Sequence, residues 1–134
     1  MKITGTHTRT KKTMRKYYDV MNERHTARKN RKPSVNPFLK KSIISFDHWE
    51  IIENDFPYDA IADVSHMLFP KRDFVFDWDL MNIKEREELD TLKKTYFNDN
   101  YDVVYENLPG AQTIPGRFHL HLLKLKRYEI DSEK

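Results

Sequence analysis

The sequence predicts an α+β domain, in which one main helix packs on an antiparallel β-sheet and a basic helical N-terminal arm precedes both. Three observations support this prediction. Short apolar runs recur between residues 42 and 126, one capped amphipathic segment lies among them, and positive charge gathers before residue 42. A chain of 134 residues is long enough for one domain with a modest core. We therefore assign residues 1–37 to the arm and its linker, and residues 38–134 to the domain.

The charge of the chain is divided unevenly. Residues 1–41 carry 13 Lys and Arg against 2 acids, whereas residues 42–134 carry 11 against 19, which gives balances of +11 and −8. The basic part suits RNA or a ribosome, because attraction to phosphate backbones does not depend on base sequence. The cations expected to make this contact are Arg9, Lys11, Lys12, Arg15, Lys16, Arg28, Lys29, Arg31 and Lys32. The alternative is a solvated extension that only keeps the protein in solution.

Cysteine is absent from the chain. Disulfides, thiolate catalysis and cysteine-based metal sites are therefore excluded, which is typical of a reducing compartment. The first residues are polar and basic, and no later apolar run approaches the length needed to cross a bilayer. We expect a cytoplasmic protein that makes no contact with a membrane.

The first expected element is a helix over residues 10–29. Its apolar positions recur at the i, i+3, i+4 and i+7 spacing of one helix face, and they are Met14, Tyr17, Tyr18 and Met21. Residues 30–38, NRKPSVNPF, contain two prolines among polar side chains and predict a linker.

Two strands joined by a turn are expected in residues 42–55, SIISFDHWEIIEND, where two apolar runs flank an Asp-His pair. Residues 56–65 are expected to form a connection, because a proline near their start cannot donate to a sheet. Residues 66–72, HMLFPKR, predict a brief strand that its proline stops.

The main helix is expected from Asn82 to about residue 98. Asn82 can accept the hydrogen bond that caps the helix, and Glu85 stands three residues later, as in a capping box. The apolar face comprises Leu89, Leu92 and Tyr96. Residues 101–107, YDVVYEN, then alternate as a strand, and residues 108–116 predict a turn-rich loop.

The last expected strand, RFHLHLLKLKRY over residues 117–128, presents two histidines together. Side chains two apart on a strand point to the same side of the sheet. One face therefore carries His119, His121, Leu123 and Leu125, and the other carries Phe118, Leu120 and Leu122. A histidine face that is half apolar suits the floor of a pocket better than an open surface.

Such a pair is compatible with three kinds of site. The imidazoles can be packed or solvated without a chemical role. They can ligate a metal, but the candidate third ligands His66, Asp73 and Glu129 form no compact motif, so we predict no metal. Alternatively, one imidazole can be a nucleophile toward phosphorus, since a neutral nitrogen attacks when the other ring nitrogen is held. Arg117, with Gln112 from the preceding loop, would then bind phosphate oxygens.

Over roughly residues 38–126 the chain resembles the histidine-triad (HIT) superfamily of nucleotide hydrolases and transferases. NDFPYDAIADVSHMLFPKR, a helix, and then YDVVYENLPGAQTIPGRFHLHLL follow that family's order. This order is a strand pair, a histidine before a Pro-Lys signature, a helix, an Asn with a Gly/Gln loop, and alternating histidines. The first histidine of the triad is Arg117 here. The resemblance implies a HIT-like antiparallel sheet, no cofactor and a homodimer.

The resemblance also implies a role for each matching residue. His119 would attack the α-phosphate of a nucleotide to form a nucleotidyl-histidine, and His121 and Arg117 would contact the phosphate. The residues expected around the nucleotide are His66, Asn107, Gln112, Thr113, Phe46 and Trp49, with Asp55 and Asp59 as candidates for a ribose contact. Pro70, Lys71 and Arg72 match the Pro-Lys signature, whose role we expect to be structural.

Two functions are therefore open. In the first, the chain is a HIT-like hydrolase or transferase acting on the α-phosphate of a nucleotide conjugate, such as a phosphoramidate or a dinucleoside polyphosphate. In the second, it is a catalytically inactive module that binds a nucleotide or RNA and uses the basic arm. The first predicts that activity disappears in His119→Ala and survives removal of residues 1–36. The second predicts that removing the arm abolishes RNA binding.

Overall fold

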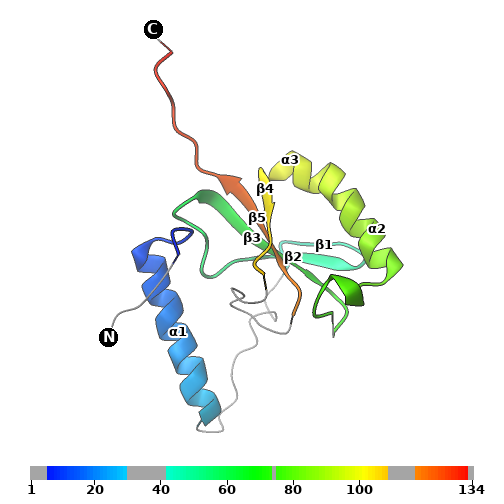
Figure 1. Cartoon of the computed structure of the whole chain (residues 1–134), viewed down its shortest axis with the longest axis horizontal. Coiled ribbons are helices and arrows are strands. Elements are labelled where there is room, and N and C mark those ends of the chain that lie inside the picture. The colour runs from blue at the N-terminus through cyan, green and yellow to red at the C-terminus, as the bar shows by residue number, and fades with distance from the viewer. Residues whose placement is uncertain (1–5, 30–41, 74, 109–116, 133–134) are drawn as a thin grey trace.

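The computed structural model describes residues 6–29, 42–73, 75–108 and 117–132 and shows an α+β architecture around a five-stranded antiparallel sheet. The elements in chain order are α1 (Lys11–Lys29), β1 (Ile44–Ser45), β2 (Trp49–Glu53), β3 (Ala62–Pro70), η1 (Trp78–Leu80), α2 (Ile83–Leu92), η2 (Lys93–Phe97), α3 (Asn98–Asn100), β4 (Val103–Tyr105) and β5 (Leu120–Leu125). The strand order is β1-β2-β3-β5-β4, so β5 comes last in the chain but lies inside the sheet (Figure 1). The predicted antiparallel sheet with a main helix and an N-terminal helix is confirmed.

The register of the strands assigns each side chain to one of two faces. Ile51 lies opposite Leu68, and Leu68 lies opposite Leu120; these side chains define the helix face. Met67 lies opposite His121, and both belong to the other side, which we call the histidine face. The alternation predicted for the last strand is therefore present in the sheet.

The helix face holds the larger hydrophobic core. α2, the π-helical turn η2 and α3 follow one another without a break and cover this face (Figure 1). The buried side chains of this core are Trp49, Ile51, Leu68, Val75, Met81, Leu89, Leu92, Phe97, Phe118, Leu120 and Leu122. Full burial of an apolar side chain of this size contributes about 1.5–3 kcal/mol. This core fixes one side of β5 and leaves the other side for the histidines.

The capping box predicted for the main helix is confirmed. The side chain of Asn82 accepts a hydrogen bond of 2.9 Å from Glu85 N, and the Glu85 carboxylate accepts one of 2.8 Å from Asn82 N. Glu85 is only 1% exposed, and its charge is paired with Arg72 at 2.7 Å. Its backbone carbonyl also accepts a hydrogen bond from Trp49 Nε1. Arg72, in the Pro-Lys signature, therefore ties the end of β3 to the start of the main helix.

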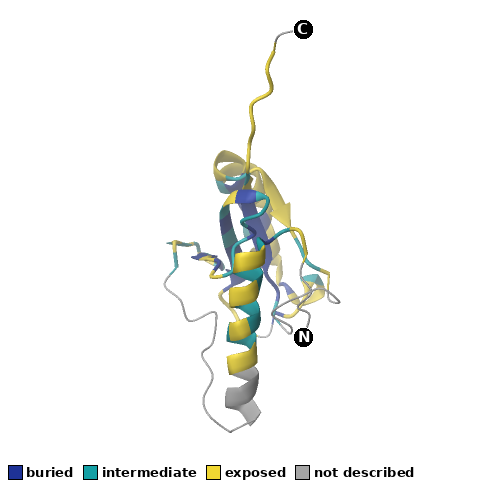
Figure 2. Ribbon diagram, turned by 90° about the vertical axis from the view of Figure 1, so that its left-hand side faces the viewer, coloured by how far each residue is buried: buried dark blue, intermediate teal, exposed yellow. Residues whose placement is uncertain are grey.

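The N-terminal helix α1 packs against the domain through its first turns. Its half-buried positions include Met14, Tyr17, Tyr18 and Met21, as the spacing predicted. Figure 2 shows exposed residues along the other side of the helix. The ring of Tyr17 meets the ring of Phe56 edge-on, with centroids 5.2 Å apart. The predicted linker lies outside the described residues.

Asp59, in the loop between β2 and β3, fixes the start of α1. Its carboxylate accepts hydrogen bonds from Thr10 N at 2.8 Å, from Thr10 Oγ1 at 3.0 Å and from the Thr13 hydroxyl. Burial alone would raise the pKa of this carboxyl, but the hydrogen bonds outweigh burial and lower the pKa of Asp59. Both carboxylate oxygens of Asp59 therefore bind the start of α1, and Asp59 does not make the ribose contact for which the sequence had suggested it.

Strand β3 is longer than the sequence predicted. It begins at Ala62, which lies opposite Leu125, and Ser65 lies opposite Leu123, with a register irregularity between Ala62 and Val64. This extension depends on the length of the partner strand, and the local pattern of residues 56–65 contains no information about that length.

In the described parts of the chain, no helix combines the length and the apolar character needed to cross a membrane.

Candidate histidine site

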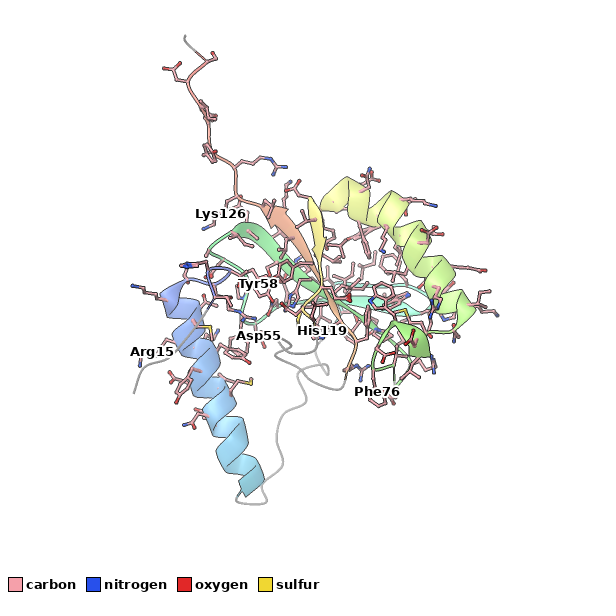
Figure 3. The ribbon with its side chains drawn as sticks, in the orientation of Figure 1. Arg15, Asp55, Tyr58, Phe76, His119 and Lys126 are labelled. Carbon is pink, nitrogen blue, oxygen red and sulfur yellow. The ribbon has the colours of Figure 1, made fainter. Side chains whose placement is uncertain are left out.

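His119 and His121 stand side by side on the histidine face, His119 directly before β5 and His121 within it. They are 3% and 1% exposed, and their ring centroids are 5.4 Å apart in an edge-on arrangement. Tyr58, from the loop between β2 and β3, packs against them. Figure 3 shows the labelled side chains of Tyr58 and His119 near the middle of the molecule, between α1 and the main helix. The pair is therefore a buried polar cluster rather than a solvated one.

His119 is held in one tautomer by the backbone. Its Nδ1 lies 3.0 Å from the carbonyl oxygen of Arg117, and because a carbonyl can only accept, Nδ1 must carry the proton. The neutral ring then has its lone pair on Nε2. Burial lowers the pKa of His119, although the hydrogen bond to the carbonyl acts in the opposite direction. At neutral pH this side chain is an uncharged imidazole whose Nε2 is unprotonated.

His121 is held by Tyr58 and Asn107. The Tyr58 ring stacks on the imidazole with centroids 4.4 Å apart and an interplanar angle of 21°, and its hydroxyl lies 3.2 Å from Nε2. The Asn107 amide donates to the Tyr58 hydroxyl at 2.7 Å and lies 3.4 Å from the same Nε2. Since an amide NH₂ group only donates, Nε2 of His121 is the acceptor and its proton is on Nδ1.

The environment of His121 keeps it neutral over a wide range of pH. Burial lowers the pKa of His121 to about 3, and the neighbouring His119 and the charge of Arg9 act in the same direction. Within the described residues, its Nδ1 has no hydrogen-bond partner. This atom is therefore a donor available to an oxygen of a ligand.

Arg117 lies on the histidine face, as the sequence predicted. Its guanidinium donates to the carbonyl oxygen of Pro70 at 3.1 Å, lies 3.5 Å from the Asp73 carboxylate, and sits over the ring of Phe69 at 5.3 Å. These contacts hold its positive charge at the end of the sheet where His119 stands. Asn107 is likewise brought to the histidines, so two of the predicted phosphate or nucleotide contacts converge on the pair.

His66 does not join the pair, contrary to the prediction. It lies opposite Leu122 and therefore points to the helix face, where its Nδ1 is 2.7 Å from the Tyr101 hydroxyl and its Nε2 is 3.5 Å from Glu53. Burial lowers its pKa, although Glu53 acts against this effect. Its neighbour Ser65 occupies the histidine face instead. A shift of one residue along a strand is enough to move a side chain to the opposite face.

Phe46 and Trp49 are also absent from the histidine face. Trp49 is fully buried in the helix-face core and meets Phe118 edge-on, and Phe46 packs against Tyr96. They were predicted to contact a nucleoside, but the parity of β2 places Trp49 against the main helix, and Phe46, in the turn before β2, packs on the same core. Both are core residues.

The predicted arm residues fall into four groups. Lys11, Lys12, Arg15 and Lys16 are exposed on α1, as a polyanion contact requires. Arg9 is only 9% exposed and is packed inside the domain, so it does not belong with them. Arg28 and Lys29 lie at the end of α1, whereas Arg31 and Lys32 lie outside the described residues. Two residues of the predicted phosphate loop, Gln112 and Thr113, also lie outside the described residues.

Sequence reasoning missed Tyr58, which makes the closest packing contact with His121. It lies in a segment that was predicted only as a connection, and its partner is 63 positions away in the chain. A small pocket elsewhere, lined by Lys93, Phe97, Asn98, Tyr101, Asp102, Val103 and Val104, contains neither histidine. No group of three His, Asp or Glu side chains suited to a metal occurs among the described residues.

Comparison with known proteins does not identify a family for this chain. No protein-family model matches the chain, and no curated protein is significantly similar to it in sequence. The crystal structure of HTC1 is similar over 89% of this chain and 76% of that chain, with 19% sequence identity and a TM-score of 0.42. A likeness of this size carries no argument about function, so the function has to be argued from the histidine site.

Proposed function

We propose that the chain is a HIT-like nucleotide hydrolase or transferase whose nucleophile is His119. One observation supports this proposal above the others: the Arg117 carbonyl holds the Nδ1 proton of a buried, neutral imidazole, so the lone pair is fixed on Nε2. Attack on phosphorus requires a neutral nitrogen of this kind.

The reaction divides one substitution into two. Nε2 of His119 forms a bond to the α-phosphorus of a nucleotide conjugate, and the leaving group departs with the electrons of its bond to phosphorus and acquires a proton. Water, or another acceptor, then attacks the nucleotidyl-histidine, breaks the N–P bond and returns the neutral imidazole. Arg117, at the same end of the sheet, and the Nδ1–H of His121 on the neighbouring ring are the groups that would stabilise negative charge on the phosphate oxygens.

The order of elements also supports the proposal. A strand pair leads to Pro70 and Arg72, the main helix follows, and the chain returns through β4 to the histidine strand inside the sheet. Arg72 pairs with the buried Glu85, which agrees with a structural role for the Pro-Lys signature. The features that depart from the family pattern are Arg117 in place of a histidine and the position of His66 on the helix face.

The test is a turnover screen with three proteins. The substrates are adenosine and guanosine phosphoramidates, dinucleoside polyphosphates and a capped nucleotide. The wild type and a matched control, His66→Ala, should release nucleoside monophosphate, whereas His119→Ala should release none. Rapid acid quench and mass spectrometry of the wild type should detect a nucleotidyl adduct on the peptide that contains His119. Equal turnover in wild type and His119→Ala, or no turnover and no adduct with any substrate, would refute the proposal.

A second function, binding of RNA without catalysis, is favoured by the exposed cations of α1. Lys11, Lys12, Arg15 and Lys16 lie on its outer side. If this is the function, RNA affinity should fall steeply with salt concentration and should be the same in the wild type and in His119→Ala. The turnover screen and the salt titration together distinguish the two functions.

A further inference from the structure

Tyr58 is fixed on all sides by residues from separate parts of the chain. Its backbone N donates a hydrogen bond to Ser65 Oγ at 3.1 Å, and its hydroxyl oxygen accepts a hydrogen bond from the Asn107 amide. The ring of Tyr105 meets it edge-on at 5.5 Å, and the guanidinium of Arg9 lies over its face at 4.7 Å. A ring so enclosed has one orientation, and in that orientation it stacks on His121.

Arg9 is fixed as firmly as the ring it covers. Its Nε donates to the carbonyl oxygen of Phe56 at 2.7 Å, and its guanidinium also lies over the ring of Tyr17 at 5.0 Å. The backbone on either side of Arg9 is held as well, because Thr8 O accepts from Ala60 N and the next residue is bound by the Asp59 carboxylate. Arg9 thus stands between α1 and the β2–β3 loop as a planar cation sandwiched by two aromatic rings.

We propose that Arg9 and Tyr58 are positioning residues for His121, so that the N-terminal segment around residues 8–17 builds one wall of the histidine site. Neither residue is placed to react; each acts through the imidazole that it holds. Arg9 fixes the plane of Tyr58, and Tyr58 fixes the plane and the tautomer of His121. For its effect on turnover the inference rests on the proposed function, whereas the effect on His121 itself does not depend on any activity.

The inference changes what is expected of the N-terminal arm. The sequence suggested that activity survives removal of residues 1–36, but that deletion removes Arg9 and exposes the face of Tyr58. A displacement of about 1 Å at a contacting group can lower a rate by as much as a hundredfold. The arm therefore has two parts, an outer row of exposed cations and an inner residue that supports the site.

The test uses point variants of the full chain and nuclear magnetic resonance of nitrogen-labelled histidine. The described titratable and charged groups that face His121 are His119 directly before β5, Tyr58, Tyr105 on β4 and Arg9. Arg9→Gln should raise the pH at which His121 titrates, because it removes a nearby positive charge. Tyr58→Phe should keep the stacked ring but let the other tautomer of His121 appear, because the hydroxyl donor to Nε2 is lost and only the longer 3.4 Å contact with the Asn107 amide still favours a proton on Nδ1. Arg15→Gln, which removes an exposed charge from the same helix, is the matched control and should leave both signals as in the wild type.

Turnover provides the second readout. Arg9→Gln and Tyr58→Phe should lower kcat about tenfold or more with little change in KM, and Arg9→Lys should restore only part of it, because an ammonium group does not stack between two rings as a guanidinium does. Unchanged His121 titration and tautomer in a folded Arg9→Gln or Tyr58→Phe protein would overturn the inference. If the wild type proves inactive but its His121 signals move as expected, the proposed function fails and the positioning role stands.

Discussion

The stability of the protein should fall as the pH is lowered, and His121 should be a large part of the reason. The pKa of His121 is lowered by burial from its ordinary value of 6.5 to about 3. Between these values the unfolded chain binds a proton at this residue and the folded chain does not. The contribution of neutral His121 to the free energy of unfolding is therefore fully present above the unfolded pKa. It decreases as the pH falls and is fully lost near the folded pKa. Integrated from about pH 7.5 to about pH 5, this single site costs about 2 kcal/mol of the free energy of unfolding.

The assay compares urea unfolding of the wild type and of His121→Asn at these two pH values. Carboxylates and His119 titrate in both proteins, so subtracting the two losses isolates the contribution of His121. The wild type should lose about 2 kcal/mol more than the variant over this interval. Equal losses in the two proteins would show that His121 titrates normally, and the description of a buried, neutral imidazole would then be wrong.

Three further predictions concern the frame of the site and the arm. Asn82→Ala, which removes the cap of the main helix, should lower the free energy of unfolding by about 1 kcal/mol in urea titrations. Arg72→Gln leaves the buried carboxylate of the capping box without its cation and should lower the free energy of unfolding clearly more than Lys71→Gln does at the neighbouring position. In filter-binding assays with single-stranded RNA, the double variant Lys11→Gln, Lys12→Gln should reduce the slope of log affinity against log salt by about 1.4, and an unchanged slope would exclude α1 from the contact.

The sequence predicted those parts of the fold that depend on neighbours in the chain. The capping box at Asn82 and Glu85 joins residues three apart, and the half-buried side of α1 follows from the spacing of its apolar residues. The faces of β5 follow from simple alternation. The length of β3 was underestimated, because its first residues are held in the sheet only by pairing with the end of β5.

The candidate site was predictable only where it lies on one strand. His119, His121 and Arg117 were placed together correctly because they are two residues apart. The prediction for His66 rested on its distance from Pro70. Successive side chains of a strand point to opposite faces, so a match that is one position off puts the side chain on the wrong side of the sheet.

The remaining contacts of the site join distant parts of the chain. Arg9 reaches a carbonyl 47 positions away, and no local pattern distinguishes it from the other cations of the arm. The charge count assigned all of these residues to a polyanion surface. Arg9 differs from them because it meets the β2–β3 loop, where the Tyr58 ring and the Phe56 carbonyl oxygen, together with the Tyr17 ring of α1, contact its guanidinium group.

The place of β5 in the sheet has a consequence for the growing polypeptide. β5 follows the other described strands in the chain, yet it lies between β3 and β4. Until residues 120–125 have emerged, neither of those strands has its inner neighbour, and the open edge of β3 and its apolar side chains can pair with other chains. The nascent protein is therefore most prone to aggregation just before the histidine strand is complete. A premature stop codon ahead of Leu120 should yield an insoluble product, even though most of the hydrophobic sequence has by then been made.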